Sequence, residues 1–486
     1  MRALISVTDK SGLDGFCRGL KKTGWVITAT SGTAAYLRSK EIPVDDTSRL
    51  TGFVKMLGGR VKTLHPAIFG GILARPSDGK DIKKHNLPLI DMVVANFYTL
   101  KKGRNFEETI DIGGLSLLRA AAKNYKRVIP VCDPSDYKTV LEALSAGNVS
   151  EKMRRALAVK VFDLCAGYNA RIAGIMSPER EFPEHLTLPL KKMTVLRYGE
   201  NPHQKAAFYS EEAFPGKILQ GKPLSYNNIL DMEAAILLAD RFSQGGCVII
   251  KHTNPCGAAV ADKQENAYKN ALACDPVSAF GGIVSFNRKV VKKTAALLTK
   301  HFFEVICAPG FDRGAGKILS GKPKLILFKY RRWNSKLAVR QALGGYLVQE
   351  AKFPTVKLLE ACGKLTKKEK DDILFGLKAA FSIASNSSLI VRNGRTLGIG
   401  PGQCSRIQSV KIAIGRAVKL TGGKMKGAVL VSDGFFPFDD SVRAASKAGI
   451  KVIAAPAGSI KDKSVAETAK KLGVKLAFVN SRFFRH

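Results

Sequence analysis

Residues 3–29, ALISVTDKSGLDGFCRGLKKTGWVITA, decide the fold class of the first part of this chain. Residues 3–7 and 25–29 are short apolar runs, and residues 11–21 between them carry apolar side chains at helical spacing. A strand, a helix and a second strand joined by short turns predict a parallel α/β sheet. Such sheets bind ligands beyond the carboxyl ends of their strands. The loops to search follow these strands and two further candidates for buried strands, residues 92–95 and 128–131.

The α/β pattern stops between residues 176 and 193 and then returns. This stretch carries Pro178, Pro183 and Pro189 among charged residues, which indicates a linker. Further apolar runs follow it at residues 247–250, 283–286, 305–308, 325–328, 428–432 and 452–455. About 290 residues are too many for one typical core. We therefore expect two domains, residues 1–190 and 194–486, the second made of two subdomains that meet near residues 330–350.

Charge and cysteine content restrict the class of protein. The 486 residues carry 78 Lys and Arg against 40 Asp and Glu, a net charge of +38. This excess suggests nucleic acid as a partner, but the basic residues are scattered and form no long basic arm. A hydrophobic content of 45% excludes disorder. No apolar run has the length of a membrane span, the N-terminus is unlike a signal peptide, and nine scattered cysteines without a CxxC pair favour a reducing cytoplasm.

Two motifs resemble well-known sites but lack a defining residue. Residues 216–222 and 316–322 both match GxxxxGK, yet Pro223 and Pro323 stand where a P-loop needs Ser or Thr for Mg²⁺. Residues 254–257, NPCG, resemble the PCxxC of zinc deaminases, but the second cysteine is missing and no HxE precedes it. We therefore expect neither a nucleoside triphosphate site nor a metal site.

Several polar clusters occupy turns at which a ligand could bind. Residues 30–33, TSGT, follow the second strand and could close around a phosphate, although an ordinary N-cap turn has the same composition. Residues 60–66 bring two cations and a histidine together, as a surface loop of a basic protein could by chance. Asp111 precedes an apolar helix that ends at Lys123, where an acid is usually a cap.

Three further clusters lie in the second half. Residues 196–204, LRYGENPHQ, are dense in polar and aromatic groups with turn formers between them. Lys251 and His252 end an apolar strand, where such a pair is costly to bury unless it has partners or a task. Residues 398–406, GIGPGQCSR, are predicted to form a glycine-rich loop that suits close approach to an anionic group.

Together these stretches resemble the bifunctional purine-biosynthesis family that carries 5-aminoimidazole-4-carboxamide ribonucleotide (AICAR) transformylase and IMP cyclohydrolase. The stretches similar to the cyclohydrolase half are residues 6–12, 59–66 and 111–114. Those similar to the transformylase half are residues 196–204, 224–228, 251–257, 275–282, 400–406, 432–438 and 480–486. They span nearly the whole chain and follow the order of the family.

The resemblance implies a fold, an assembly and a pair of reactions. The fold is α/β, with an N-terminal methylglyoxal-synthase-like doubly wound domain and a C-terminal half of two cytidine-deaminase-like subdomains without zinc. The assembly is an intertwined homodimer with transformylase sites at the subunit interface. The reactions are the last two steps of IMP synthesis, formyl transfer from 10-formyltetrahydrofolate to AICAR and dehydrative ring closure. No metal, membrane or specific nucleic acid is implied.

The resemblance also implies roles for individual residues. In formyl transfer His252 is the base, Lys251 assists it and Asn386 orients the reacting groups. The residues implied to contact the substrate of this reaction are Arg197, Tyr198, Gly281, Glu304, Arg406, Phe435 and Arg482. The residues implied to catalyse ring closure are Lys62, Tyr98, Asp111 and Lys123. Those implied to bind the nucleotide and its phosphate there are Ser6, Lys10, Thr33, Arg60 and Thr63.

The chain departs from the family pattern at two positions. Phe69 stands where the family usually has His, and Ala384 stands where it usually has Lys. These departures leave open a protein that retains only one activity. Two readings of another class are a basic nucleic-acid-binding protein and a regulatory nucleotide-binding module, and the second leaves Lys251 and His252 unexplained. Because every residue implied to be catalytic is present, we expect both activities.

Overall fold

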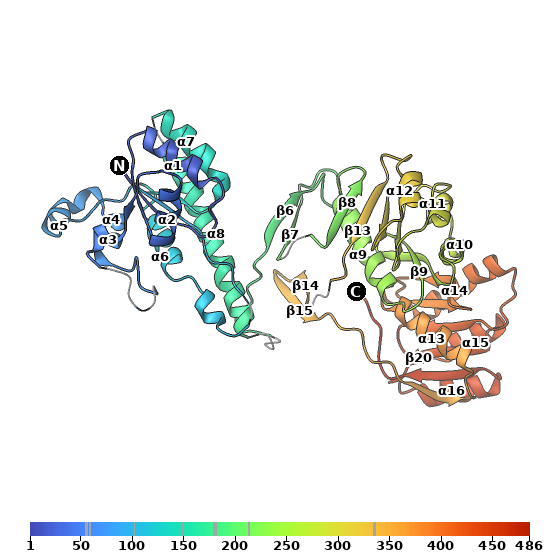
Figure 1. Cartoon of the computed structure of the whole chain (residues 1–486). Coiled ribbons are helices and arrows are strands. Elements are labelled where there is room, and N and C mark those ends of the chain that lie inside the picture. Colours follow the sequence, from blue (N-terminus) through green and yellow to red (C-terminus); the bar gives the residue numbers. More distant parts are fainter. Residues whose placement is uncertain are drawn as a thin grey trace. The chain divides into compact units, whose positions relative to one another are not determined.

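The structure of the chain is a computed structural model that describes residues 1–53, 57, 60–101, 103–147, 149–177, 182–211, 214–333 and 337–486. It divides into two compact units, Met1–Leu190 and Lys191–His486. We call them the N-terminal unit and the C-terminal unit and describe each by itself (Figure 1). Both are α/β, which confirms the predicted fold class.

A parallel sheet forms the centre of the N-terminal unit. Its strand order is β3-β2-β1-β4-β5, and all its ladders are parallel. The strands are β1 (Arg2–Ser6), β2 (Val26–Ala29), β3 (Asp45–Asp46), β4 (Met92–Ala95) and β5 (Ile129–Val131). Chain order reverses between β1 and β4, the place at which sheets of this kind bind ligands.

Helices cover both faces of this sheet, as expected for a doubly wound fold. Successive residues of a strand point to opposite faces, so Ile5 joins one apolar cluster and Leu4 joins the other. Phe16 stacks on Tyr137 in the first cluster. The helices are α1 (Leu13–Lys22), α2 (Ser31–Ser39), α3 (Ser48–Thr51), α4 (Pro66–Leu73), α5 (Gly79–Lys84), α6 (Gly113–Lys123), α7 (Tyr137–Ser145) and α8 (Glu151–Met176), with short 3₁₀ turns at Pro76–Asp78, Phe106–Thr109 and Pro134–Asp136.

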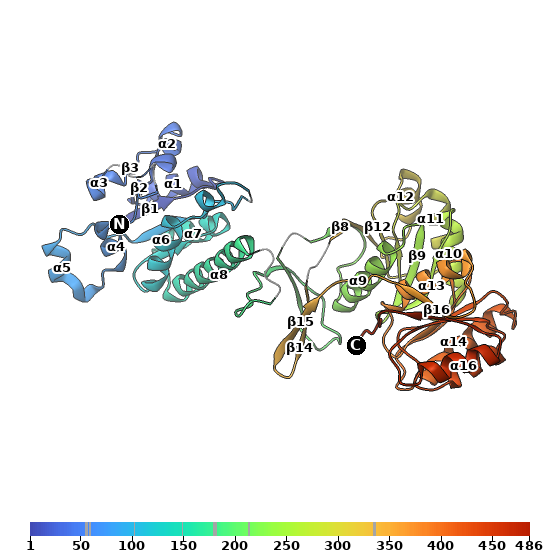
Figure 2. The same ribbon diagram turned by 90° about the horizontal axis from the view of Figure 1, so that it is seen from below.

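Two six-stranded sheets with the same topology make up most of the C-terminal unit (Figures 1 and 2). The first has the order β10-β9-β11-β12-β13-β8 and the second β18-β17-β19-β20-β21-β16. The first is built from β8 (Gly216–Gln220), β9 (Gly246–Lys251), β10 (Asn254–Val260), β11 (Ile283–Phe286), β12 (Val305–Ala308) and β13 (Ile326–Tyr330). The second is built from β16 (Leu358–Cys362), β17 (Ser388–Val391), β18 (Thr396–Gly400), β19 (Val429–Ser432), β20 (Val452–Pro456) and β21 (Lys475–Val479).

Each sheet has its own helices, and two hairpins complete the unit. The helices of the first copy are α9 (Tyr226–Asp240), α10 (Gln264–Cys274), α11 (Lys292–Leu298) and α12 (Arg313–Leu319). Those of the second copy are α13 (Lys367–Ala380), α14 (Arg406–Thr421), α15 (Asp440–Lys447) and α16 (Asp462–Lys471). The hairpins are β6 (Lys191–Val195) with β7 (Ala207–Ser210), and β14 (Leu337–Ala342) with β15 (Gly345–Glu350).

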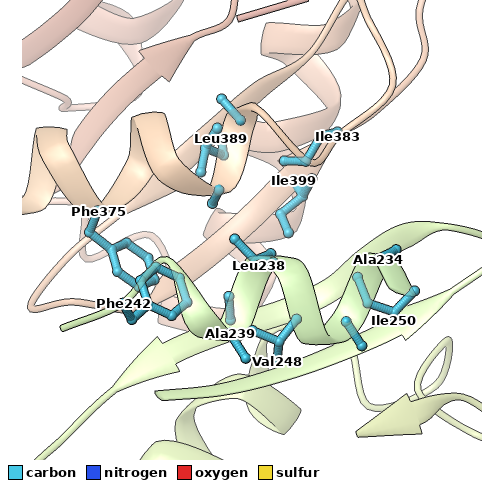
Figure 3. Close-up of a cluster of buried hydrophobic side chains, with 14 of the residues drawn as sticks. Ala234, Leu238, Ala239, Phe242, Val248, Ile250, Phe375, Ile383, Leu389 and Ile399 are labelled. Atoms are coloured by element: carbon cyan, nitrogen blue, oxygen red, sulfur yellow. The ribbon is translucent and has the colours of Figure 1, made fainter. Parts of the chain in front are cut away.

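The two copies form an internal repeat with a spacing of 141 residues through their first helix and hairpin. Ser225 begins α9 with a capping box, and Thr366 begins α13 in the same way. The first helices of both copies pack into one apolar cluster, where Phe242 stacks on Phe375 with ring centroids 4.8 Å apart (Figure 3). The edge strands β10 and β18 also meet, because the amide of Ala258 donates to Thr396 Oγ1 at 3.0 Å. This shared core joins the two copies.

The glycine-rich stretch at residues 398–406 differs from its prediction. Gly398 and Gly400 belong to strand β18 and not to a loop. A Cβ on Gly398 would lie 2.2 Å from the carbonyl oxygen of Ala413, and one on Gly400 would lie 2.1 Å from that of Ser409. These glycines therefore let α14 pack directly on the strand, and only residues 401–405 form a turn. Both GxxxxGK matches also lack P-loop geometry, since the first coincides with β8 and the second with the end of α12.

Candidate active sites

The carboxyl ends of β1 and β2 bring together two residues expected to bind a nucleotide in the N-terminal unit. Ser6 ends β1, and its hydroxyl oxygen accepts a hydrogen bond from Thr30 Oγ1 at 3.2 Å. Thr33 lies in the first turn of α2 and is buried. Its Oγ1 lies 3.2 Å from both the amide nitrogen and the carbonyl oxygen of Val7. Thr33 therefore ties the start of α2 to the end of β1.

Asn96, which the sequence analysis did not single out, holds the loop after β1. Its Oδ1 accepts hydrogen bonds from the amides of Thr8 at 2.6 Å and Asp9 at 3.0 Å, and its Nδ2 donates to the carbonyl oxygen of Asp9. Its position directly after the buried strand β4 is the feature of the sequence by which Asn96 could have been predicted as a site residue. Lys10 lies in the same loop, with its Nζ 5.8 Å from the ring centroid of Tyr36.

Asp111 is a buried acid beside the start of α6. Its Oδ1 accepts a hydrogen bond from the amide of Gly114 at 2.7 Å, and its own amide donates to the hydroxyl oxygen of Tyr168 at 2.8 Å. Burial raises the pKa of this carboxyl, although the amides of Gly114 and Tyr98 and the charge of Lys62 oppose the shift. The acid therefore lies close to two other residues implied to be catalytic, Lys62 and Tyr98.

The remaining residues implied for ring closure lie at different distances from this acid. Thr63 is buried next to the start of α6, because its Oγ1 lies 3.1 Å from the position of a Cβ on Gly113. Arg60 forms an ion pair with Glu108. Lys123 is exposed at the last residue of α6. The length of that helix puts the Cα of Lys123 on the order of 15 Å from that of Asp111, so these two residues lie at opposite ends of α6.

The turn between β9 and β10 carries His252. His252 and Thr253 both have left-handed backbone conformations, with φ of 49° and 58°. Lys251 is the last residue of β9, and its Nζ donates a hydrogen bond to the carbonyl oxygen of Phe280 at 2.8 Å. The imidazole is exposed at the tip of the turn. Lys251 therefore lies against the neighbouring loop while His252 projects from the sheet.

Gly281 and Glu304 lie at the same edge of the first sheet as Lys251, because β9, β11 and β12 are neighbours there. The amide of Gly281 donates to the carbonyl oxygen of Phe302 at 2.9 Å, with φ of 73° at Gly281. The Glu304 carboxylate forms an ion pair with Lys222 at 2.5 Å. The positive charge of Lys222 therefore offsets the negative charge of the Glu304 carboxylate.

Arg406 and Asp433 form a buried ion pair that fixes Asn386. The Arg406 guanidinium donates to Asn386 Oδ1 at 2.8 Å and to the carbonyl oxygen of Ser387 at 3.0 Å. Asp433 is 0% exposed and also accepts from Ser385 Oγ at 2.6 Å and from the amide of Ser387 at 3.0 Å. Asp433 was not predicted from the sequence. The side-chain amide of Asn386 is therefore oriented by a charge buried beneath it.

A hollow of about 370 Å³ opens beside this network. Its lining includes Asn386, Cys404, Arg406, Phe435, Phe438, Asp440 and Phe484. Aromatic rings next to a guanidinium suit a planar ligand with an anionic or amide group. The guanidinium of Arg482 lies 5.3 Å from the ring centroid of Phe484, which places Arg482 at the rim.

Asn254 connects the turn of His252 with the segment that carries Asn386. Its Nδ2 donates to the carbonyl oxygen of His252 at 3.1 Å, and its Oδ1 accepts from the amide of Ala384 at 3.0 Å. Ala384, one of the two departures from the family pattern, thus contributes its backbone at this point. Phe69, the other departure, packs against the apolar cluster beneath α4.

The C-terminal residues make a second connection between the same two segments. The Arg485 guanidinium donates to the carbonyl oxygen of Thr253 at 2.8 Å. The backbone of Arg485 also pairs with Ser385, whose amide donates to the Arg485 carbonyl oxygen at 2.9 Å. The first copy of the repeat carries His252 and the second carries Asn386, so these contacts hold the turn of His252 against the segment of Asn386.

Arg197 and Tyr198 lie in the turn after β6. The Arg197 guanidinium is 5.3 Å from the ring centroid of Tyr198. In the same turn the carbonyl oxygen of Glu200 accepts from Asn227 Nδ2 at 3.1 Å, which places the turn at the start of α9.

In the part of the chain that the structure describes, no three His, Cys, Asp or Glu side chains are grouped as they would be to hold a metal. No described helix combines the length and the apolar character needed to span a bilayer.

Comparisons with known proteins agree with this architecture. A family model described as AICARFT/IMPCHase bienzyme matches residues 121–416, and one described as MGS-like domain matches residues 12–126. The chain belongs to the AICARFT/IMPCHase bienzyme family. As a member of this family it is a bifunctional formyltransferase and IMP cyclohydrolase of purine biosynthesis, which confirms the resemblance found in the sequence.

Relatives of this AICARFT/IMPCHase chain match it from end to end. The bifunctional purine biosynthesis protein PurH of Persephonella marina is 43% identical over 100% of this chain and 99% of its own length. The protein of the same description from Aquifex aeolicus is 42% identical over 100% of both chains. A solved structure described as "Crystal structure of ForH" is 39% identical over 36% of this chain and 98% of its own, with a TM-score of 0.35, too low to bear on the fold.

Proposed function

We propose that the C-terminal unit transfers the formyl group to AICAR and that the N-terminal unit closes the ring to IMP. One observation carries the first assignment: Asn254 and Arg485 hold the turn of His252 against the segment of Asn386. The second assignment is supported by Asp111, a buried acid beside Lys62 and Tyr98. Two separate sites therefore serve two consecutive reactions.

Formyl transfer needs a base, because the lone pair of the AICAR amino group is delocalised into the ring and the carboxamide. His252 accepts the proton of this amine as its nitrogen bonds to the formyl carbon. Lys251 stabilises the negative charge that develops on the formyl oxygen. Asn386 orients the carboxamide, and its own orientation is fixed by Arg406. The donor is 10-formyltetrahydrofolate: the bond between its N10 and the formyl carbon breaks, and N10 takes the proton from His252 as tetrahydrofolate leaves.

The surroundings of Lys251 and Asn386 fit both substrates. Phe280 and Phe302 are exposed beside Lys251 with ring centroids 5.2 Å apart, and they offer an apolar surface to the planar ring system of the folate. The hollow beside Asn386 fits the base of the nucleotide. Two exposed cations, Arg482 beside Phe484 of this hollow and Arg197 in the turn after β6, would bind its phosphate. Tyr198, Gly281, Glu304 and Phe435 contribute the remaining contacts.

Ring closure needs charge stabilisation at the formyl oxygen and transfer of protons until water leaves. Lys62 stabilises the oxygen as the carboxamide nitrogen attacks the formyl carbon. Asp111 and Tyr98 move protons between the nitrogen and the departing oxygen. The residues that bind the nucleotide and its phosphate are Ser6, Lys10, Thr33, Arg60 and Thr63. Lys123 lies at the opposite end of α6 from Asp111 and receives no step in the proposed reaction.

The proposal extends to assembly and location. We place the enzyme in the cytoplasm because all nine of its cysteines, which lie within the described ranges, are free thiols. We also propose a homodimer with transformylase sites at the interface. Exposed apolar side chains on the hairpin of β14 and β15, Leu343, Tyr346 and Leu347, support a covering partner. A monomeric mass in light scattering at micromolar concentration would contradict the dimer.

Two assays on the purified chain test the separate sites. Folate-dependent formylation of AICAR and ring closure of formyl-AICAR are measured independently. His252→Ala should abolish formylation and spare ring closure, and Asp111→Ala should do the reverse. Undiminished formylation in His252→Ala overturns the assignment of the base. Loss of both reactions in either variant contradicts two independent sites.

The charge of +38 motivates a second candidate function, nucleic-acid binding. It is tested by titrating random DNA at several salt concentrations. An enzyme with a merely basic surface should bind weakly and lose that binding by about 0.2 M salt. Tight binding that persists at this salt would favour the second candidate.

A further inference from the structure

We propose that Asp231 is a positioning residue for formyl transfer, which holds the backbone of His252 and Thr253 in the left-handed conformation that places the imidazole at the site. The inference rests on the proposed role of His252. Asp231 lies on α9. Its Oδ2 accepts a hydrogen bond from the amide of His252 at 3.1 Å, and its Oδ1 accepts one from the amide of Thr253 at 2.6 Å. Both oxygens of one carboxylate are thus used on consecutive amides.

The turn that Asp231 holds contains two residues that disfavour its conformation. Left-handed backbone brings Cβ close to the following carbonyl oxygen, and a β-branched side chain such as that of Thr253 makes the crowding worse. Two adjacent residues, at φ of 49° and 58°, keep this conformation. Such backbone persists only where the surroundings determine it, and it is concentrated at functional sites. The carboxylate of Asp231 is the group that bonds both amides.

The second copy of the repeat also has an aspartate whose carboxylate bonds two consecutive amides, an arrangement we call the clamp. There the two residues that it holds adopt left-handed backbone without strain. Asp372 stands 141 residues after Asp231, on α13. Its oxygens accept from the amides of Asn393 at 3.0 Å and Gly394 at 2.7 Å, whose φ values are 57° and 65°. Asn and Gly are the residues that adopt left-handed backbone most readily. The clamp is therefore a feature of the repeat, and the first copy uses it to hold residues that would otherwise relax.

Relaxation would move the imidazole because φ and ψ set the direction of the Cα–Cβ bond. The carbonyl side of the turn is already held, since Asn254 bonds the carbonyl oxygen of His252 and Arg485 bonds that of Thr253. Asp231 supplies the hold on the amide side. With only one side held, the peptide planes can rotate and His252 no longer points to the position fixed for the amine of AICAR.

The test compares Asp231→Ala with Asp372→Ala, which removes the same two hydrogen bonds from the other copy. Asp231→Ala should lower kcat of formyl transfer about 10²-fold with little change in KM for AICAR, because a misplaced base weakens the chemical step more than binding. Asp372→Ala should leave kcat near that of the parent, although Asp372 is the more buried of the two. Asp231→Asn keeps one acceptor and should fall between.

Several results would overturn the inference. Equal losses of kcat in Asp231→Ala and Asp372→Ala, or a change in KM alone, would show a structural role only. If Asp231→Ala does not fold, the test uses Asp231→Asn with and without Thr253→Gly. Because glycine adopts left-handed backbone without strain, the added Thr253→Gly should recover kcat. No recovery of kcat contradicts the proposal. His252→Ala is measured alongside. If it keeps formyl transfer, the proposed function fails; if it is inactive while Asp231→Ala is active, only the positioning role is wrong.

Discussion

Replacing Asp433 by Asn tests the buried charge beneath the transformylase hollow. The carboxylate is 0% exposed and accepts from the amide of Ser387 and the hydroxyl of Ser385. An Asn side chain has the same shape, and because both bonds go to the same carboxylate oxygen, Oδ2, the amide oxygen of Asn can accept both. It removes the negative charge, however, and leaves the Arg406 guanidinium, 7% exposed, without a counterion. The substitution therefore isolates the ion pair from the hydrogen bonds around it.

The expected cost follows from what Arg406 retains. Removing one partner of a buried ion pair typically costs ~3–5 kcal/mol. Arg406 still donates to Asn386 Oδ1 at 2.8 Å and to a backbone carbonyl at 3.0 Å, so we expect the lower end, a loss of ~3 kcal/mol. The first copy supports this reasoning. Asn287 follows β11 as Asp433 follows β19, and Gly246 is the equivalent of Ser387 in the first copy. The amide oxygen of Asn287 accepts a hydrogen bond from the amide of Gly246 at 2.8 Å, so an uncharged side chain is enough for this backbone bond. The carboxylate is needed for the arginine and not for the backbone.

Urea unfolding measures this loss in the right part of the chain. The sequence has 2 tryptophans, Trp25 in the N-terminal unit and Trp333 in the C-terminal unit, so in a Trp25→Phe background the fluorescence follows the C-terminal unit. The matched variant is Asp433→Asn combined with Arg406→Met. It removes both charges and should recover stability relative to Asp433→Asn alone. Formyl transfer should fall further in the double variant, where Asn386 loses the hydrogen bond from Arg406, than in Asp433→Asn, where that bond remains. Ring closure should persist in both.

Two results would refute this account of the ion pair. Asp433→Asn could unfold at the same urea concentration as the parent, which would mean that the charge of Arg406 needs no partner. Alternatively, the double variant could be less stable than the single one, which would mean that the pair stabilises the unit through packing of the Arg406 side chain.

Two further substitutions test the packing of α14 and an ion pair in the N-terminal unit. Gly398→Ala should cost ~3 kcal/mol or more in urea unfolding, because its Cβ would lie 2.2 Å from the carbonyl oxygen of Ala413. Its control Gly415→Ala, which has open space in the middle of α14, should gain ~0.5–1 kcal/mol. Burial alone would raise the pKa of Asp133, but hydrogen bonds from Lys160 and from Ser135 lower it from 3.8 to about 2. A depressed pKa stabilises the fold above pH 4, and this effect is lost as pH falls through 2. Lys160→Met should therefore cost ~1 kcal/mol at pH 7, after screening at a 41% exposed carboxylate, and much less at pH 2, where about half of the carboxyls are protonated. An equal cost at both pH values, measured from Trp25 fluorescence in a Trp333→Phe background, would contradict this explanation.

Local pattern predicted ten of the 21 strands that the structure describes. Residues 92–95 and 305–308 are apolar throughout and residues 283–286 are apolar except for Ser285, and each forms a four-residue strand with the predicted bounds. Such runs are readable because both faces of a parallel strand are buried. The predicted loop at residues 398–406 was wrong in its first part, since glycine composition alone does not separate a turn from a strand on which a helix packs closely.

The candidate site could be predicted only as a set of residues. Motif resemblance named Lys251, His252, Asn386 and Arg406, but it gave no means of finding Asp231 or Asp433. Single aspartates carry no signal in a chain with 40 acidic residues. Their partners lie 21 to 48 residues away in sequence, and only the register of the strands brings them together. The separation of Lys123 from Asp111 likewise follows from the length of one helix.

The sequence by itself determined the α/β class, the family and the residue types of both reactions, because apolar periodicity and short motifs are local properties of the chain. The tertiary structure decided which of those residues meet. It joined His252 of one repeat copy to Asn386 of the other through Asn254 and Arg485, contacts that span 130 and 232 residues. Contacts of that range depend on topology and on a shared core between α9 and α13, and no local pattern encodes them.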